Sequence, residues 1–324
     1  MQSNINWGGI FPVVPTPLVE DESLDYAGLS HLVNFYVDSG CHGLVILGSG
    51  GEYPYFTFHE KLRIIEVTVK EAKRRVPVIA GAGFYSMVEA VKFIKAAEEL
   101  GIDGFLIALP TYYPIGFQEV YDFYSQLCKN TEKPVLYYHY PQITGLRFHP
   151  EQISRILSID GIEGIKESSL NLPEMRAHLR FVKKEKFTLF SGNSFLLLDT
   201  LALGGHGVIC PIPSVAPRLV VDCYNAWRSK DFARAHKLQD KILDFLPLMN
   251  SFNLPVSIQK AGLKLISHAP FRLKMGNLSR HAVIKETLRQ LGHPINARVR
   301  SPLPQITDRE KQAITKLLNK FNPE

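Results

Sequence analysis

Short apolar runs alternate with longer amphipathic stretches along the first two thirds of the chain. Three of these runs follow turns bounded by glycines, which are Gly40 to Gly43, Gly101 to Gly104 and Gly204 to Gly207. Glycine commonly follows the end of a helix because it adopts the left-handed backbone conformation without strain. Runs of four to eight branched or aromatic residues between such turns are typical of buried parallel strands. The repeated order of helix, glycine turn and strand predicts a chain built from βα units.

The number of apolar runs decides between two kinds of α/β fold. Eight strands that alternate with helices favour a closed (β/α)8 TIM barrel over an open, doubly wound sheet. The predicted strands are Gly9 to Pro15, Leu44 to Leu47, Val76 to Ala82, Phe105 to Leu109, Val135 to Tyr140, Ile162 to Lys166, Phe187 to Ser191 and Val208 to Cys210. The predicted helices between them include Leu24 to Ser39, His59 to Arg74, Met87 to Leu100, Phe117 to Asn130, Glu151 to Leu157 and Pro173 to Lys183.

The strand pattern stops after about Pro217, and only helical patterns follow. This change predicts an all-helical C-terminal extension. Its helices are expected at Ala233 to Leu246, Val256 to His268, Arg280 to Leu291 and Asp308 to Phe321. We therefore divide the chain into a barrel that carries the active site, residues 1–225, and a C-terminal extension, residues 226–324.

Charge and cysteine usage exclude several classes of partner. The net charge of +6 is spread along the chain, with no basic stripe and stacking aromatics, so we expect no nucleic-acid partner. The four cysteines form no CxxC pair and lack metal-ligand spacing, which is typical of reduced, buried cysteines. The chain start does not resemble a signal peptide, and the most apolar stretch, Phe195 to Leu203, is too short to cross a bilayer. We expect a cytoplasmic protein with no membrane partner.

One residue at the carboxyl end of a predicted strand stands out. Lys166 is the lone lysine in the apolar sixth strand, so its amine must either reach solvent or be desolvated, and desolvation favours the neutral form. A neutral amine is the nucleophile that Schiff-base enzymes use on carbonyl substrates. Because TIM barrels carry their chemistry at this end of the strands, other candidates are expected beside it. They are Gly48, Ser49, Gly50, Tyr113, Tyr138, Thr144, Ser168, Asn193 and Ile209.

Several of these candidates have a structural as well as a chemical interpretation. The segment from Gly48 to Glu52 is either a plain strand-to-helix turn or a cradle of backbone N–H groups for a carboxylate. Tyr138 is either a core residue or a proton relay. His139 cannot share the orientation of Tyr138, because neighbouring strand residues point to opposite faces, and we interpret it as a structural histidine. His59-Glu60 lacks the second histidine of a zinc helix, so no metal site is predicted.

Taken together, the motifs resemble those of the dihydrodipicolinate synthase and N-acetylneuraminate lyase family. The resemblance runs from about Gly8 to the C-terminal helices. The shared motifs are Gly-Ser-Gly-Gly-Glu at 48–52, Tyr-Tyr at 112–113, Tyr-x-x-Pro-x-x-Thr-Gly at 138–145, Gly-Ile-Lys-Glu at 164–167, Ser-Gly-Asn at 191–193 and Leu-Gly-Gly-His-Gly-Val-Ile at 203–209. The resemblance implies a class I aldolase on a (β/α)8 barrel, which handles pyruvate through a covalent imine and needs no cofactor.

The resemblance also implies a role for each matched position. Lys166 would form the imine with pyruvate or another 2-keto acid, and Tyr138 would shuttle the proton with Ser49 as relay. The N–H groups of Ser49 and Gly50 would hold the substrate carboxylate. Tyr113 would reach into the site of a neighbouring subunit, which implies a homo-oligomer, either a dimer or a dimer of dimers.

Two departures from the synthase pattern bear on the substrate. Ile143 stands where synthases carry the arginine that grips the aldehyde's carboxylate, and Gly50 stands where they carry a second threonine. The motifs are closer to members that cleave 2-keto-3-deoxy acids such as 2-keto-3-deoxygluconate. We therefore expect an aldolase that cleaves or forms such an acid, with pyruvate and an aldehyde as the other reactants.

Other functions remain compatible with the same residues. On the same lysine, the alternatives are a 4-hydroxy-tetrahydrodipicolinate synthase, a 4-hydroxy-2-oxoglutarate aldolase and a keto-acid dehydratase. The alternative of another class is a non-catalytic pyruvate-binding protein.

Overall fold

The computed structural model of the chain describes residues 7–181, 187–250, 254–268 and 280–320, and its eight strands form one parallel sheet. The strand order is β1-β8-β7-β6-β5-β4-β3-β2. A parallel bridge between Val13 and Val45 joins the two ends of this order, so the sheet closes into a barrel. The strands are β1 (Gly9–Pro12), β2 (Leu44–Ile46), β3 (Val78–Gly83), β4 (Gly104–Ala108), β5 (Val135–His139), β6 (Ile162–Glu167), β7 (Thr188–Ser191) and β8 (Gly207–Cys210). The predicted (β/α)8 TIM barrel is confirmed.

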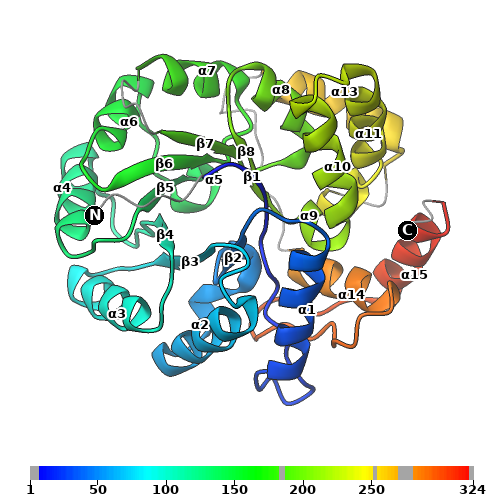
Figure 1. Cartoon of the computed structure of the whole chain (residues 1–324), viewed down its shortest axis with the longest axis horizontal. Coiled ribbons are helices and arrows are strands. Elements are labelled where there is room, and N and C mark those ends of the chain that lie inside the picture. The colour runs from blue at the N-terminus through cyan, green and yellow to red at the C-terminus, as the bar shows by residue number, and fades with distance from the viewer. Residues whose placement is uncertain (1–6, 182–186, 251–253, 269–279, 321–324) are drawn as a thin grey trace.

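Helices surround the sheet (Figure 1) and connect successive strands. Several begin at a side-chain cap: Asp25 accepts from the Gly28 N–H, and Thr57 and Glu60 form a capping box, which satisfies N–H groups that the first turn leaves free. The helices of the barrel are α1 (Tyr26–Asp38), α2 (Phe58–Ala72), α3 (Met87–Glu99), α4 (Phe117–Lys129), α6 (Pro150–Leu157), α7 (Leu172–Phe181), α8 (Leu197–Ala202) and α10 (Pro217–Arg228). Short helical turns at the strand ends are η1 (Ser49–Gly51), η2 (Tyr53–Tyr55), α5 (Pro141–Thr144), η3 (Ser194–Leu196) and α9 (Ile212–Val215).

The remaining described helices belong to the C-terminal part of the chain. They are α11 (Phe232–Leu243), α12 (Leu246–Met249), α13 (Val256–Ile266), α14 (His281–Gln290) and α15 (Asp308–Leu318). Figure 1 shows α14 at the edge of the barrel, where it contacts α9. The C-terminal helices are present as predicted. The boundary predicted between residues 225 and 226 falls inside α10 and stays a prediction.

A few predicted element ends differ from the structure. β1 ends at Pro12 rather than Pro15, because after Pro12 only a single bridge from Val13 to Val45 and the hydrogen bonds of the Val13 and Val14 N–H groups continue the pairing. The predicted helix from Pro173 to Lys183 corresponds to α7, and residues 182–186 lie outside the described part of the chain. The helix predicted to end at Phe321 ends at Leu318, and residues 321–324 also lie outside it.

The barrel has two separate apolar layers. The interior holds Phe11, Leu106, Tyr138, Phe190 and Ile209 among others. A larger cluster fills the space between the outer face of the sheet and the helices. All four cysteines are free and buried. None of the helices in the described ranges combines the length and the apolar character needed to cross a membrane.

Candidate active site

Lys166 and Tyr138 face each other across two neighbouring strands. They are register partners in β6 and β5, and the Lys166 Nζ lies 4.0 Å from the centroid of the Tyr138 ring. Lys166 is only 3% exposed. Burial lowers the pKa of Lys166 to about 7, although the nearby Cys210 acts in the opposite direction. A large fraction of this amine is therefore neutral near pH 7 and able to attack a carbonyl carbon.

Tyr138 is held as a neutral phenol among hydroxyl groups. Burial raises the pKa of Tyr138 to about 12, and side-chain hydrogen bonds with Ser49 and Ser168 act against this rise. The ring of Tyr140 stacks on it with centroids 5.6 Å apart. Since a protonated phenol both donates and accepts hydrogen bonds, Tyr138 is placed to pass a proton between the Ser49 and Ser168 hydroxyls and a molecule bound at Lys166.

A glycine makes room for the Ser168 hydroxyl. A Cβ atom at Gly192 would stand 1.9 Å from the Ser168 Oγ, well inside the contact distance of two heavy atoms. The Gly192 N–H donates to the Glu167 carbonyl at 2.7 Å, which holds the end of β7 against the end of β6. Any side chain at position 192 would therefore displace Ser168 from Tyr138.

Ser49 lies in a strained turn at the end of β2. Leu47 and Glu52, on either side of the turn, have φ values of 53° and 62°, which non-glycine residues rarely adopt. The hydrogen bonds of the turn use the N–H groups of Gly51 and Glu52. The N–H groups of Ser49 and Gly50 take no part in this internal bonding, so the turn can present them to an anion.

The C-terminal helix α14 holds this turn in place. His281 Nε2 lies 2.6 Å from the Ser49 carbonyl oxygen, and Lys285 Nζ lies 2.6 Å from the Glu52 Oε1. The other carboxylate oxygen of Glu52 accepts from the Arg300 backbone N–H at 2.8 Å. The side chains of Glu52 and Lys285 are 0% exposed, and breaking such a buried pair costs far more than breaking a surface pair. The sequence analysis missed His281 and Lys285, because nothing in the linear pattern links residues about 230 positions apart to the turn.

Replacing Lys285 by methionine is expected to destabilise the fold and loosen the turn. The change leaves the Glu52 carboxylate buried without its counter-charge, and we expect a loss of about 3 kcal/mol in the free energy of unfolding. This estimate is at the low end of the range for buried pairs, because the Arg300 N–H still donates to Glu52. Urea unfolding of both proteins measures the difference, and the KM for the 2-keto acid that the family resemblance leads us to expect should rise in the variant.

A surface lysine provides the control for this substitution. Lys260 Nζ lies 2.7 Å from the Asp244 Oδ1, but both side chains are partly exposed. Lys260→Met should cost less than about 1 kcal/mol. Equal losses in the two variants would contradict the proposed importance of the Glu52 pair.

The other predicted site residues have varied surroundings. Ile209 is fully buried in the barrel interior with Tyr138. Thr144 donates to the Tyr140 carbonyl at 3.1 Å, and the Asn193 side chain accepts from the Phe195 N–H at 2.8 Å. Tyr113 is 75% exposed and packs edge-on against Tyr112. The structure thus brings Tyr138 to Lys166, and Ser49 and Ser168 to the Tyr138 phenol. The side chains of Thr144, Asn193 and Tyr113 have other neighbours.

Two further tyrosines near the site were not predicted. Tyr140 stacks on Tyr138, and burial raises its pKa well above the ordinary value. Burial likewise raises the pKa of Tyr53, with an additional contribution from Tyr138. Both lie close to motifs that the sequence analysis selected, since Tyr53 follows Glu52 and Tyr140 follows β5 by one residue. The clustering of aromatic residues around these motifs was the available signal.

Comparison with known proteins places the chain among related sequences and structures. The family model described as the dihydrodipicolinate synthetase family matches residues 6–280. A relative named probable 2-dehydro-3-deoxy-D-pentonate aldolase YjhH, from Escherichia coli K12, is 33% identical over 264 residues, covering 80% of this chain and 87% of that protein. A 4-hydroxy-tetrahydrodipicolinate synthase from Methanosphaerula palustris is 32% identical over 273 residues, covering 83% of this chain and 94% of that protein.

A solved structure from the same family also matches this chain. The crystal structure of YagE, a prophage protein of the dihydrodipicolinic acid synthase family from E. coli K12, was determined in complex with pyruvate. It superimposes on this chain with a TM-score of 0.85 at 26% sequence identity, covering 98% of this chain and 99% of that one.

Proposed function

This chain belongs to the dihydrodipicolinate synthetase family, and from that premise we propose that it is a class I aldolase that cleaves a 2-keto-3-deoxy acid to pyruvate and an aldehyde. The observation that carries the proposal is the buried Lys166 amine against the face of Tyr138, with two serine hydroxyls at the phenol. The family membership supplies the reaction class, a carbon–carbon lyase that depends on pyruvate. No metal or organic cofactor is proposed for the reaction itself, because a covalent imine can supply the electron sink.

The proposed reaction uses Lys166 as nucleophile and Tyr138 as acid and base. The neutral amine adds to the keto carbon of the substrate, and the Tyr138 phenol gives its proton to the leaving hydroxyl, so that loss of water gives a protonated imine and a phenolate. That phenolate, through Ser49, then removes the proton of the hydroxyl on the second carbon from the imine carbon, on the side away from the carboxylate. The bond between the hydroxyl-bearing carbon and the carbon next to the imine carbon then breaks, and the aldehyde leaves. The imine nitrogen takes up the electron pair of this bond, which gives an enamine. Protonation of the enamine and hydrolysis release pyruvate and restore Lys166.

The substrate carboxylate is proposed to bind at the turn after β2. The N–H groups of Ser49 and Gly50 supply the donors, and the strained turn keeps them fixed. A Cβ at Gly50 would stand 2.9 Å from the Val13 Cγ1, so the threonine found in synthases would need the turn or Val13 to shift. This supports a turn of different shape from that of the synthases.

The direct test has two steps. Incubation of the full chain with pyruvate and borohydride should add one reduced pyruvate at Lys166, as located by peptide mass spectrometry. Coupled assays with 2-keto-3-deoxygluconate, 2-dehydro-3-deoxypentonate and 4-hydroxy-2-oxoglutarate then identify the keto acid. Failure to label Lys166 would remove the mechanism, whereas labelling without turnover of any keto acid would favour a non-catalytic pyruvate-binding protein.

A second candidate is a 4-hydroxy-tetrahydrodipicolinate synthase, the name carried by several relatives. It would condense pyruvate with aspartate semialdehyde on the same lysine. Ile143, at the position of the arginine expected from synthases, is 64% exposed and offers no charge to a second carboxylate. This observation favours the aldolase, and consumption of aspartate semialdehyde with pyruvate would reverse that preference. The same assays would reveal a keto-acid dehydratase by the absence of an aldehyde product.

The rate of imine formation should follow the titration of Lys166. Its pKa of about 7 lies far below that of an ordinary lysine, and only the neutral amine attacks. The initial rate of cyanoborohydride trapping with pyruvate should therefore rise about tenfold per pH unit below about pH 7 and level off above it. A rate that continues to climb to about pH 9 or beyond would show an unshifted lysine and contradict the burial of its amine.

Two finer proposals concern assembly, which rests on family membership, and location, which rests on the cysteines. Tyr113 is proposed to act in the site of a neighbouring subunit, and its 75% exposure leaves its phenol available for such a contact. If the full chain sediments as a monomer, Tyr113 cannot act in the site of a neighbouring subunit. We infer a cytoplasmic location from the four free, buried cysteines, and a measured disulfide in protein from its native source would contradict it.

A further inference from the structure

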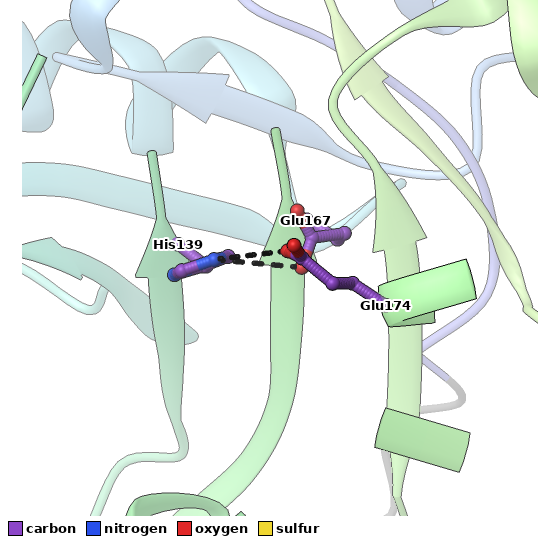
Figure 2. Close-up of side chains that lie close together, drawn as sticks. All are labelled: His139, Glu167 and Glu174. Carbon is purple, nitrogen blue, oxygen red and sulfur yellow. Dashed lines mark ion pairs between the residues drawn. The ribbon is translucent and has the colours of Figure 1, made fainter. Parts of the chain in front are cut away.

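A second cluster of chemically active side chains lies behind the catalytic lysine. His139 and Glu167 follow Tyr138 and Lys166 in β5 and β6, and they are register partners as well. Because side chains alternate along a strand, they lie on the outer face of the barrel. There they meet Glu174 and His178, which are four residues apart and so lie on one face of α7. Figure 2 shows His139, Glu167 and Glu174 pointing toward one another from three separate elements.

The distances between these donor atoms fit a metal centre better than a hydrogen-bonded network. His139 Nε2 lies 3.9 Å from Glu167 Oε2 and 3.9 Å from Glu174 Oε2, which is too long for a hydrogen bond. One donor atom from each of the three residues lies within 4.8 Å of the others. His178 Nδ1 stands 3.2 Å from Glu167 Oε2. In a tetrahedral zinc site, bonds of about 2.0 Å place donor atoms about 3.3 Å apart. His139, Glu167 and Glu174 need only a small contraction to reach this spacing, whereas His178 lies outside their 4.8 Å group and would have to turn toward the ion.

The carboxylates are already oriented for binding through one oxygen each. The Oε1 of Glu167 accepts from the Ser169 N–H at 2.6 Å, and the Oε1 of Glu174 accepts from the Asn171 Nδ2 at 2.7 Å. The Oε2 atoms of both residues face His139. Hydrogen bonds of this kind fix the ligands of metal sites and tune their affinity.

Burial leaves donor atoms of the cluster without hydrogen bonds. Within the described residues, Glu167 Oε2 and both ring nitrogens of His178 are buried and form no hydrogen bond of acceptable geometry. The 3.2 Å approach of His178 to Glu167 is short enough but poorly aligned. Unsatisfied buried polar atoms are costly, and all three belong to side chains that are 0% exposed.

Charge also favours a divalent cation. With neutral imidazoles, the two carboxylates give the cluster a formal charge of −2, and one divalent ion would balance it. Two imidazole nitrogens and two carboxylate oxygens are ligands that zinc accepts. Glu174 is the only one of the four with appreciable exposure, 28% of its side chain, which provides an entry path for the ion.

We propose that His139, Glu167, Glu174 and His178 bind a zinc ion that fastens α7 to β5 and β6 directly behind Tyr138 and Lys166. The ion would be structural, since four protein ligands leave no open position for a substrate. The site was not predicted from the sequence, because its donors are scattered over 40 residues, from 139 to 178, and follow no familiar ligand spacing.

Zinc content of the full chain tests the proposal. After treatment with EDTA, desalting and exposure to Zn²⁺, the dialysed protein should retain about one zinc ion per chain. Glu174→Gln removes one ligand at a partly exposed position and should abolish this retention. Asn171→Ala should weaken binding by about tenfold or more, because Asn171 only orients Glu174. Zinc should raise the thermal unfolding midpoint of the unmodified protein but not that of the Glu174 variant.

A surface histidine pair supplies the control. His31 Nε2 lies 2.9 Å from His293 Nδ1 on the exposed surface, and such a pair can take up zinc without a built site. His31→Gln should leave zinc retention unchanged. Loss of zinc in this variant, equal retention in the Glu174 variant, or no retention by the unmodified protein would each overturn the proposal.

Cobalt provides a measurement that does not depend on zinc affinity. Co²⁺ bound to the four proposed ligands should give the strong visible absorption of tetrahedral cobalt, and Glu174→Gln should remove it. A weak spectrum typical of octahedral cobalt would contradict the proposed four-ligand tetrahedral site. None of these readouts uses turnover, so they stand apart from the aldolase assignment.

Discussion

Lys166→Met is expected to abolish turnover and pyruvate labelling while leaving the barrel folded. Loss of a covalent nucleophile costs about 10⁵-fold or more in kcat in comparable enzymes. Methionine has nearly the same length as lysine and carries no amine that must be desolvated, so the buried position should tolerate it well. The thermal midpoint is therefore expected to stay the same or rise. Trapping with borohydride, turnover assays and thermal unfolding of the same preparation give the three readouts.

Lys61 offers a matched control for the lysine chemistry. Its amine is also partly buried, burial lowers its pKa, and its Nζ lies 6.0 Å from the Tyr53 ring centroid. If burial and a neighbouring tyrosine were enough to make a lysine reactive, Lys61→Met would reduce labelling too. We expect the Lys61 variant to label as the unmodified protein does, because within the described residues no serine hydroxyl is hydrogen-bonded to Tyr53 as Ser49 and Ser168 are to Tyr138. Residual labelling of the Lys166 variant at another lysine would refute the assignment of the nucleophile.

The barrel was predictable because its signals are local. Each glycine turn, apolar run and cap acts within a few residues, so the eight strands and most helices could be read from neighbouring positions. Of the eight longer helices of the barrel, two were not assigned. α8, Leu197–Ala202, is buried at three of its six residues and too short to show a helical period. α10, Pro217–Arg228, does bury Pro217, Val220 and Val221 at helical spacing, so its signal was present and was overlooked.

The candidate site was predictable only in part, and for a physical reason. Lys166, Tyr138 and Ser49 could be selected because strand ends of a parallel barrel meet at one place. The residues that fix their geometry come from elsewhere: Lys285 binds Glu52 from the C-terminal extension. Contacts between distant segments depend on how helices pack, and packing leaves little trace in a single sequence. The sequence analysis interpreted His139 only as a structural histidine for the same reason. Its contacts with Glu167 and Glu174 depend on how α7 packs against the sheet.

Tyr138 tests whether the phenol, rather than the aromatic ring, carries the proton. Tyr138→Phe keeps the ring that stacks on Tyr140 and covers the Lys166 amine, but it removes the hydroxyl that bonds with Ser49 and Ser168. Loss of a general acid–base group costs about 10² to 10⁴ in rate, and we expect kcat to fall by about 10³-fold, or about 4 kcal/mol in activation free energy. The KM should change little. Pyruvate should still label Lys166, although more slowly.

The neighbouring Tyr137 separates this effect from simple packing. It lies on the same strand with its side chain in the outer layer, where it packs against Tyr124 at 5.1 Å between ring centroids. Tyr137→Phe removes an equally buried hydroxyl from the opposite face of the sheet, so it should leave kcat within about threefold of the unmodified enzyme. If both variants lost activity equally, the loss would reflect disturbed packing of β5. If neither did, water or another hydroxyl would have to carry the proton, and the relay through Tyr138 would be wrong.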